Sequence, residues 1–344
     1  MPYPIEQKLV VAVSATALFD LEAEHQLYLD LGIDKFREHQ RANRHITPDR
    51  GAAFPFIQRL LNLNDIYPKE KPIEVVILSR HHADAGLRIM DAVKTYGLDI
   101  SRSFFLAGTL PFRYMKAVNS VLYLSTNKEE VKTAVEQGFP AGQVLPCKTL
   151  PTDEDKQLRI AFDFDGVLVD DEAEKIYAKS KNLDIFHEYE RANREIPLHS
   201  GPLMPLLQQI SRFQKLERQK AQGDSTYTQM LRIAVITARN APAHERLVNT
   251  LSSLDIETDE LFLMGGIEKK AVLDVLKPHI FFDDQLGHLT GASESTPSVH
   301  IPFGVTNPIA SGKSQTPSVV ISPVPKKEPL SVVVDADKAV KKLN

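Results

Sequence analysis

The sequence is short of the features that mark secreted and membrane proteins. It holds one cysteine, Cys147, in 344 residues, so an intramolecular disulfide is excluded and a reducing compartment is favoured. No apolar run approaches the roughly 18 residues of a membrane-spanning helix. The first ten residues, MPYPIEQKLV, lack the long apolar core of a signal peptide. We therefore expect a soluble cytoplasmic protein with no membrane partner.

A basic excess is also missing. Lysine and arginine number 41 against 45 acidic residues, and the formal net charge is −4. Proteins that bind nucleic acids usually present a basic face, so we expect no nucleic-acid partner. The hydrophobic content of 42% and charged content of 25% are typical of a soluble globular protein. The length is sufficient for two domains.

The chain contains a diverged tandem repeat. Residues 9–60 align with residues 159–210 at a constant shift of 150, and sixteen aligned positions are identical. Unrelated sequences of average composition would share roughly three. The similarity continues where residues 75–89 face residues 233–247. Because internal repeats indicate repeated structural units, the two halves are expected to fold alike.

Each half alternates short β-branched runs with longer helical patterns, which is typical of an α/β fold with a parallel sheet. In the second half we expect strands at residues 158–164, 231–237, 260–264 and 279–284. A helix-rich insertion separates the first two strands and predicts a helical cap at about 171–228, in which ERANRE (190–195) is expected to be a solvated face. The predicted organisation is therefore two doubly wound, Rossmann-type halves, 1–150 and 151–307, and a flexible Pro/Ser-rich tail, 308–344.

Reactive residues follow the predicted strands of the second half, where ligands bind in open parallel sheets. In chain order they are Asp163 and Asp165, then Thr237-Ala238-Arg239, then Lys269 and Lys270 ahead of the last strand, then Asp283-Asp284. Four carboxylates at one sheet edge would repel each other without a divalent cation. Because all four offer oxygen ligands, the pattern favours Mg²⁺ and phosphoryl transfer.

This ordered set resembles the motifs of the haloacid dehalogenase (HAD) superfamily. The resemblance implies that Asp163 is a nucleophile that forms an aspartyl phosphate and that Asp165 is the general acid and base. It further implies that the phosphate or substrate is contacted by Thr237, Ala238, Arg239 and Lys269. The metal ligands that it implies are Asp163, Asp165, Asp283 and Asp284, with Asp284 as the direct ligand. Lys270 remains an alternative to Lys269.

Longer stretches resemble one family within that superfamily. SATALFDLEAEHQLY, GAAFPFIQRL, HIFFDDQLGH and HIPFGV are similar to the cytosolic 5′-nucleotidase I family, over roughly residues 8–306. The resemblance implies Mg²⁺-dependent hydrolysis of AMP-like nucleoside 5′-monophosphates and activation by nucleotides. Phe164 and Gly166 depart from the family pattern, which leaves base preference open. Other readings are a phosphatase of another small ester, such as a sugar phosphate, and a nucleotide-sensing binding protein; a homo-oligomer also stays open.

The first half lacks the aspartates. The residues at the four carboxylate positions are Val13, Ala15, Ser125 and Thr126, so this half cannot form an aspartyl phosphate. Ser79 stands where Thr237 stands, and Lys116 lies in the region equivalent to Lys269. One interpretation is a packing partner from which His82 or Arg88 reaches the substrate. The other is a second, regulatory nucleotide site that uses Ser79 and Lys116.

Overall fold

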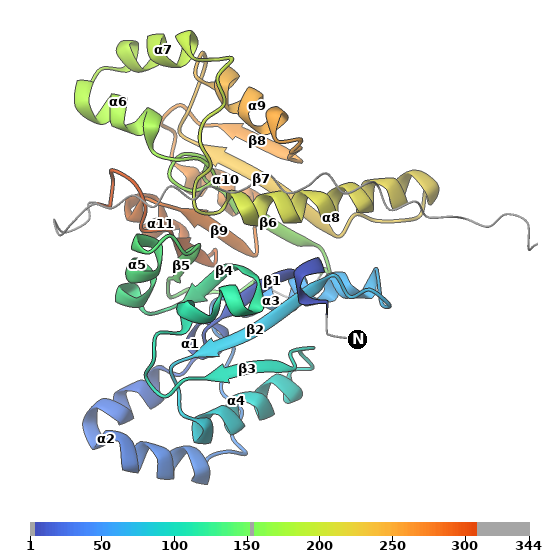
Figure 1. The fold of residues 1–344 in the computed structure, drawn as a ribbon, viewed down its shortest axis with the longest axis vertical. Coiled ribbons are helices and arrows are strands. Elements are labelled where there is room, and N and C mark those ends of the chain that lie inside the picture. The colour runs from blue at the N-terminus through green and yellow to red at the C-terminus, as the bar shows by residue number, and fades with distance from the viewer. Residues whose placement is uncertain (1–3, 152–154, 308–344) are drawn as a thin grey trace, which may run out of the picture. The chain divides into compact units, whose positions relative to one another are not determined.

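One mixed sheet runs through the described part of the chain. The computed structural model describes residues 4–151 and 155–307, and the predicted tail 308–344 lies outside them (Figure 1). Ten strands are hydrogen-bonded in the order β3-β2-β1-β4-β5-β10-β9-β6-β7-β8. Every neighbouring pair is parallel except β5 and β10. The predicted α/β fold with a mostly parallel sheet is thereby confirmed.

The first repeat contributes five strands, with helices between them. The strands are β1 (Leu9–Val13), β2 (Ile73–Ser79), β3 (Arg102–Phe105), β4 (Ser120–Ser125) and β5 (Ala141–Val144). The α-helices are α1 (Ala15–Leu18), α2 (Glu22–Ala42), α3 (Phe54–Asn62), α4 (Ala83–Thr95) and α5 (Lys128–Glu136). Short 3-10 helices are η1 (Ile5–Gln7), η2 (Leu63–Asp65), η3 (Pro111–Tyr114) and η4 (Lys116–Val118).

The second repeat follows the same plan. Its strands are β6 (Leu158–Phe162), β7 (Leu231–Thr237), β8 (Glu260–Leu263), β9 (Ile280–Asp283) and β10 (Ser298–His300). Its helices are α6 (Glu172–Ser180), α7 (Leu183–Ala192), α8 (Met204–Gly223), α9 (His244–Ser253), α10 (Lys269–Leu276) and α11 (Leu286–Ala292). No helix in the two described ranges is long and apolar enough to cross a membrane.

The central strands are mostly apolar and almost wholly buried because helices cover both faces of the sheet. Every residue of β1 and β2 is buried, and β7 is buried except at Arg232. Alternating polar and apolar residues, which mark a strand with one wet face, are therefore absent from these strands. The functional groups lie instead at the strand ends.

The two repeats have the same strand order and the same helical insertion. The second-half order β8-β7-β6-β9-β10 repeats the first-half order β3-β2-β1-β4-β5. Helix α2 has a non-helical residue, Gly32, with φ 75°. A shift of 150 places Gly32 opposite Asn182, which separates α6 from α7. Helix α2 is therefore the first-half counterpart of the α6–α7 pair, and the two insertions lie at opposite ends of the sheet (Figure 1).

The repeats share a core where they meet. Helix α8 of the second half packs on β1 and β4, and α3 of the first half packs on β6. The ring of Phe56, on α3, lies edge-on to Phe282, on β9, with 6.5 Å between centroids. One buried apolar cluster contains residues of both repeats. The domain boundary near residue 150 therefore crosses a continuous core, and separate domains stay a prediction.

Candidate active site

Three adjacent strands deliver the predicted residues to one edge of the sheet. β6 lies between β9 and β7, and all three run parallel. Their carboxyl ends carry Asp163, Thr237 and Asp283, all of which are buried. The backbone N–H of Asp163 donates to the carbonyl of Phe282 at 2.7 Å, which fixes the spacing of the first and last motifs. The sheet order therefore brings together residues that lie up to 120 positions apart in the chain.

Lys269 joins the first and last motifs. It begins α10 and is buried, and its Nζ lies 2.9 Å from Asp163 Oδ1 and 2.7 Å from Asp283 Oδ2. Burial disfavours its charge, but the two carboxylates outweigh burial and raise the pKa of Lys269 to about 12. Lys270 points elsewhere and pairs with Asp274 at 2.7 Å near the surface. Of the two candidate lysines, the structure places Lys269 at the site.

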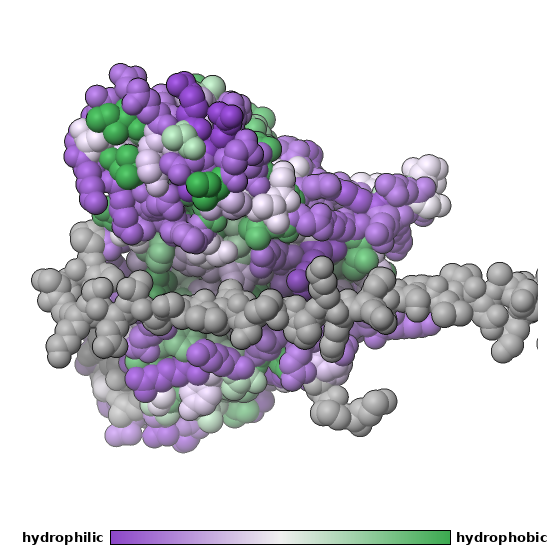
Figure 2. Space-filling model, turned by 45° about the horizontal axis from the view of Figure 1, so that its top comes forward, coloured by the Kyte–Doolittle hydropathy of each residue, from purple (hydrophilic) through white to green (hydrophobic). Residues whose placement is uncertain are grey.

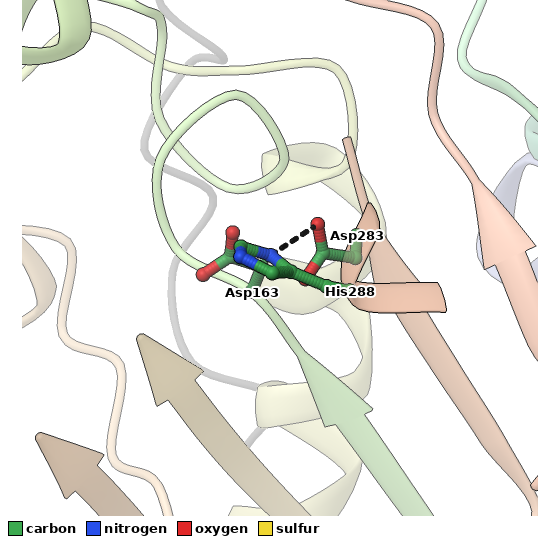
Figure 3. A group of neighbouring side chains, drawn as sticks. All are labelled: Asp163, Asp283 and His288. Carbon is green, nitrogen blue, oxygen red and sulfur yellow. Dashed lines mark hydrogen bonds and ion pairs between the residues drawn. The ribbon is translucent and has the colours of Figure 1, made fainter. Parts of the chain in front are cut away.

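The group in Figure 3 shows how Asp283 is held. Ligand-type atoms of Asp163, Asp283 and His288 lie within 4.8 Å of one another (Figure 3). The Lys269 ammonium, however, contacts both aspartates, so it competes with any cation for this space. His288 Nδ1 lies 3.1 Å from Asp283 Oδ2, and burial of Asp283 is outweighed by Lys269 and His288, which lower its pKa. Asp283 is therefore held on two sides, by Lys269 and by His288, next to Asp163.

Asp284 has a carboxylate oxygen that accepts no hydrogen bond from the described residues. Its Oδ2 accepts from Thr306 Oγ1 at 2.5 Å, while its buried Oδ1 has no hydrogen-bond partner among the described residues. Gly166 permits this packing: its φ is 71°, and a Cβ there would lie 2.7 Å from Asp284 Cγ. Only glycine adopts that conformation without strain and leaves room for the carboxylate.

A further carboxylate at the site was not predicted from the sequence. Glu174, on α6, receives Gln285 Nε2 at 2.9 Å, and its Oε2 has no partner among the described residues. Burial, followed by repulsion from Asp165 and Asp163, raises the pKa of Glu174 to about 8. Its place in the exposed-looking EAEK run gave no signal, because the contact depends on how α6 folds back over the sheet.

The carboxylates are too crowded for all of them to be ionised without a counter-charge. Burial, followed by repulsion from Glu174 and Asp163, raises the pKa of Asp284 to about 9. Burial is also the main cause that raises the pKa of Asp163 to about 7, against the opposing effect of Lys269. A cation near these groups would favour their charged forms. The unpartnered oxygen of Asp284 and the oxygen-only donors suit a hard divalent cation.

The carboxylate of the second motif residue, Asp165, is held by Arg239. Arg239 donates two hydrogen bonds to it, from Nε to Oδ2 and from Nη2 to Oδ1, both at 2.7 Å. Asp165 was predicted to be the general acid and base and a metal ligand; in the structure both its carboxylate oxygens accept from the guanidinium of Arg239. Thr237 Oγ1 accepts from the backbone N–H of Arg239 at 3.1 Å, and Ala238 is exposed between these two buried residues.

Comparison with known proteins fits this geometry. Residues 1–308 match the profile of the protein family described as 5′-nucleotidase. The chain belongs to the 5′-nucleotidase family. It is 33% identical over 299 residues to human cytosolic 5′-nucleotidase 1B, an alignment that covers 85% of this chain and 48% of the relative. The chain thus spans about half the length of that relative. No solved structure gives a significant match. The family resemblance expected from the sequence is confirmed.

The first half of this 5′-nucleotidase family member has a cavity at the corresponding place. It has a volume of about 1200 Å³ and lies at the carboxyl ends of β1, β2 and β4. Its lining includes Ser79 and His82, two of the predicted residues, and also Ser125 and Thr126, which stand at the positions of the metal aspartates. Basic groups reach it from Arg50 and Arg80. The cavity has mixed polar and apolar walls, and its acidic residues, which include Asp20 and Glu130, do not stand at the positions of Asp163, Asp165, Asp283 and Asp284.

Arg88, predicted to reach the substrate from the first half, and Lys116, predicted for the second nucleotide site, lie elsewhere. Arg88 is buried against α2: it donates to the carbonyl of Ile46 at 2.8 Å and to Glu24 Oε1 at 2.5 Å. Lys116 is exposed, and its Nζ lies 5.6 Å from the ring centroid of Phe139. Neither lines the cavity. Arg88 instead holds the insertion through Glu24 and the carbonyl of Ile46, and Lys116, at the start of η4, is exposed.

Proposed function

We propose that this chain is a Mg²⁺-dependent 5′-nucleotidase that hydrolyses AMP-like nucleoside 5′-monophosphates to nucleoside and phosphate. The observation that carries the proposal is the buried Asp163–Lys269 pair beside Thr237, at adjacent strand ends of a 5′-nucleotidase family member. The name of the human relative supports the same substrate class and a cytosolic setting. We extend both to this chain, and infer that it works in the cytoplasm.

The proposed metal site uses Asp163 and Asp284. The unpartnered Oδ1 of Asp284 and the raised pKa of both carboxyl groups fit a hard cation with oxygen ligands. Mg²⁺ is favoured because it keeps waters and binds phosphate oxygens with few carboxylates. When bound, it would neutralise negative charge on the phosphoryl group. Asp283 supports the site through Lys269 and His288 rather than as a ligand.

The proposed reaction has two displacement steps. A carboxylate oxygen of Asp163 attacks phosphorus, and the bond from phosphorus to the nucleoside 5′-oxygen breaks as Asp165 gives that oxygen a proton. Lys269 and Thr237 donate hydrogen bonds to the phosphoryl oxygens. Water then attacks the aspartyl phosphate and gives a proton to Asp165, which frees Asp163 and releases phosphate. Before Asp165 carries a proton to the leaving oxygen, one of its bonds to Arg239 must open.

The repeated topology supports a finer description of the fold. We infer that both halves are HAD-like, since each has the strand order seen in the other and the same helical insertion after its first strand. In the catalytic half the cap is α6 and α7, whereas α8 belongs to the sheet layer because it packs on β1 and β4.

The family match and the human relative favour a nucleoside 5′-monophosphate over a sugar phosphate. Figure 2 shows apolar patches that interrupt the hydrophilic surface of the cap, and its exposed apolar residues include Leu183 and Ile185. The assay that decides is phosphate release from a panel of esters with Mg²⁺ and with EDTA. We expect AMP to exceed sugar phosphates with Mg²⁺ and no release with EDTA; preference for a sugar phosphate would overturn the substrate assignment.

A second ligand site is also proposed, in the first-half cavity. Ser79, His82 and two arginines line a space of about 1200 Å³ at the position that corresponds to the active site. Such a site would hold a nucleotide without hydrolysing it and could act as an activator site. Calorimetry on Asp163→Asn should give two nucleotides per chain. One nucleotide per chain, lost when the catalytic pocket alone is mutated, would overturn the second site.

A further inference from the structure

The guanidinium of Arg239 lies between the active site and the cap. Toward the site it donates two hydrogen bonds of 2.7 Å to Asp165. On its other side Nη1 donates to Glu190 Oε2, on cap helix α7, and, at 3.2 Å, to the carbonyl of Ala243, which precedes α9. Arg239 is 4% exposed and Glu190 1%. ERANRE was predicted to be a solvated face of the cap, and this is wrong for Glu190, whose carboxylate is inside the protein.

Glu190 is shared with a second arginine. Its Oε1 accepts from Arg246 Nη1 at 3.0 Å. Arg246 also donates to Glu172 Oε1 at 3.0 Å and to the carbonyl of Ile196 at 2.8 Å. Helix α9 therefore holds both cap helices through Arg246, since Glu172 lies on α6 and Glu190 on α7. Of these two glutamates, only Glu190 also contacts Arg239, which in turn binds Asp165.

The first repeat shows which of these contacts the cap itself needs. Arg246 aligns with Arg88, and Arg88 makes the same bond to the equivalent carbonyl, that of Ile46, at 2.8 Å. It also has a carboxylate partner, Glu24, and a contact of 3.3 Å to Gln40 Oε1. The anchor between helix and insertion is thus retained in a half that has no catalytic aspartates.

The other three residues of this network, Asp165, Arg239 and Glu190, are all replaced in the first repeat. Where the second half has Asp165, Arg239 and Glu190, the first half has Ala15, His81 and Gln40. His81 turns to the strand end instead, with Nδ1 2.7 Å from Ser79 Oγ. A role in cap packing alone would not explain this joint loss, because the insertion and its arginine anchor persist. Arg239 and Glu190 thus have no counterparts in the half that also lacks a counterpart of Asp165.

We propose that Arg239 and Glu190 are positioning residues for Asp165, through which cap helix α7 sets the orientation of the general acid and base. The inference rests on the proposed function. It also reassigns Arg239, which the sequence placed among the substrate contacts. A bidentate arginine fixes both the position and the plane of a carboxylate, and Glu190 fixes the arginine. Misplacement of a reacting group by about 1 Å can reduce a rate by ~100-fold.

Substitution of Glu190 tests this. Glu190→Gln installs the residue of the first repeat, Gln40, with which that half folds. We expect kcat for AMP with Mg²⁺ to fall ~10- to 100-fold, with KM within about threefold, because transition-state placement rather than ground-state binding is lost. Arg239→Lys, which keeps the charge but not the fork, should lower kcat at least as much. The double variant should be no worse than Arg239→Lys, since the two residues act as a unit.

Glu172→Gln is the matched control, because it removes a carboxylate from Arg246 in the same cap without touching Arg239. Its kcat should stay within about threefold of wild type. Equal losses of kcat in Glu172→Gln and Glu190→Gln, or none in either, would overturn the inference. If the wild-type protein itself does not hydrolyse AMP, that result would instead count against the proposed function.

A stability measurement, which needs no enzymatic turnover, tests the link from Glu190 to Asp165 independently of the proposed function. Asp165 and Glu190 share Arg239, so the shifts in melting temperature of Asp165→Asn and Glu190→Gln should be non-additive in the double variant. Asp165→Asn combined with Glu172→Gln should be closer to additive. Equal additivity in both pairs would overturn the link from the cap to Asp165.

Discussion

The ammonium of Lys269 lies 2.9 Å from Oδ1 of Asp163, the proposed nucleophile, in a place where both residues are buried. The lysine stabilises the charge of the carboxylate before reaction and, in the proposed mechanism, the charge of the phosphoryl oxygens during it. Because Asp283 holds the other side of the ammonium at 2.7 Å, the lysine cannot move far when the substrate binds.

Loss of this charge should abolish most of the activity. Lys269→Met should lower kcat by about 1000-fold, in the range found when a preorganised electrostatic donor is removed. Lys270→Met is the control, since Lys270 pairs with Asp274 near the surface, and it should retain wild-type kcat. Steady-state AMP hydrolysis at saturating Mg²⁺ measures both. A larger loss in Lys270→Met would show that the neighbouring lysine is the functional one.

The crowded carboxylates should make the metal-free protein less stable as pH rises. The folded-state pKa is raised to about 8 for Glu174 and about 9 for Asp284, above the ordinary carboxyl value of about 4. The folded state therefore binds protons more tightly than the unfolded state, and the resulting stability is present below about pH 4 and lost through pH 8–9. Melting curves in EDTA should shift to lower temperature from pH 6 to pH 9, and excess Mg²⁺ should reverse the shift at pH 9.

Asp284→Asn should weaken that dependence. It removes one charge from the cluster, so we expect the metal-free melting temperature at pH 8 to rise by about 2–8 °C, with loss of the Mg²⁺-induced increase. Asp274→Asn, a change at an exposed carboxylate, should leave the pH trend as in wild type. A melting temperature in EDTA that rises from pH 6 to pH 9 would contradict the proposed crowding.

Gly166 should tolerate no side chain. Gly166→Ala would place a Cβ 2.7 Å from Asp284 Cγ at a φ of 71°, so we expect the free energy of unfolding to fall by ~3 kcal/mol from backbone strain and overlap together. Gly97→Ala has a similar φ of 67° but open space around it, and should cost only ~1 kcal/mol. Urea unfolding compares the two; equal losses would show that contact with Asp284 is unimportant.

The two repeats should not fold separately. Helices α3 and α8 pack on strands of the other half, and the largest apolar cluster spans both. Residues 151–344 expressed alone should therefore show no cooperative melting transition, while the full chain melts in one. A cooperative transition for the isolated segment would support independent domains with a boundary near residue 150.

The sequence predicted the features that are set by the residue pattern within one strand or helix. It missed the features that depend on which side chains of different elements contact each other. Acidic and hydroxyl residues at the ends of apolar runs located Asp163, Thr237 and Asp283, because parallel strands end at one sheet edge. Whether Lys269 or Lys270 faced the site depended on the rotation of α10, which one residue of spacing cannot settle.

Residues on the cap were the least predictable. Glu190 lies in a run that was predicted to be a solvated face, and Glu174 was not singled out at all, yet Glu190 contacts Arg239 and Glu174 contacts Gln285 at the sheet edge. Arg88 was predicted to reach the substrate from the first half, and its actual partners, Glu24 and the carbonyl of Ile46, lie more than 40 residues earlier in the chain. The aligned pair Arg88 and Arg246 could have indicated a structural role, since one of them lies in a half without catalytic aspartates.

The central claim is that Asp163 attacks phosphorus, and phosphate release from AMP by Asp163→Asn tests it most directly. Asparagine keeps the shape of the side chain, so the variant should melt as a folded protein, and circular dichroism provides that control. We expect its kcat with Mg²⁺ to fall by more than about 1000-fold, as when other enzymes lose a covalent nucleophile. A folded Asp163→Asn protein with kcat within tenfold of wild type would contradict the mechanism.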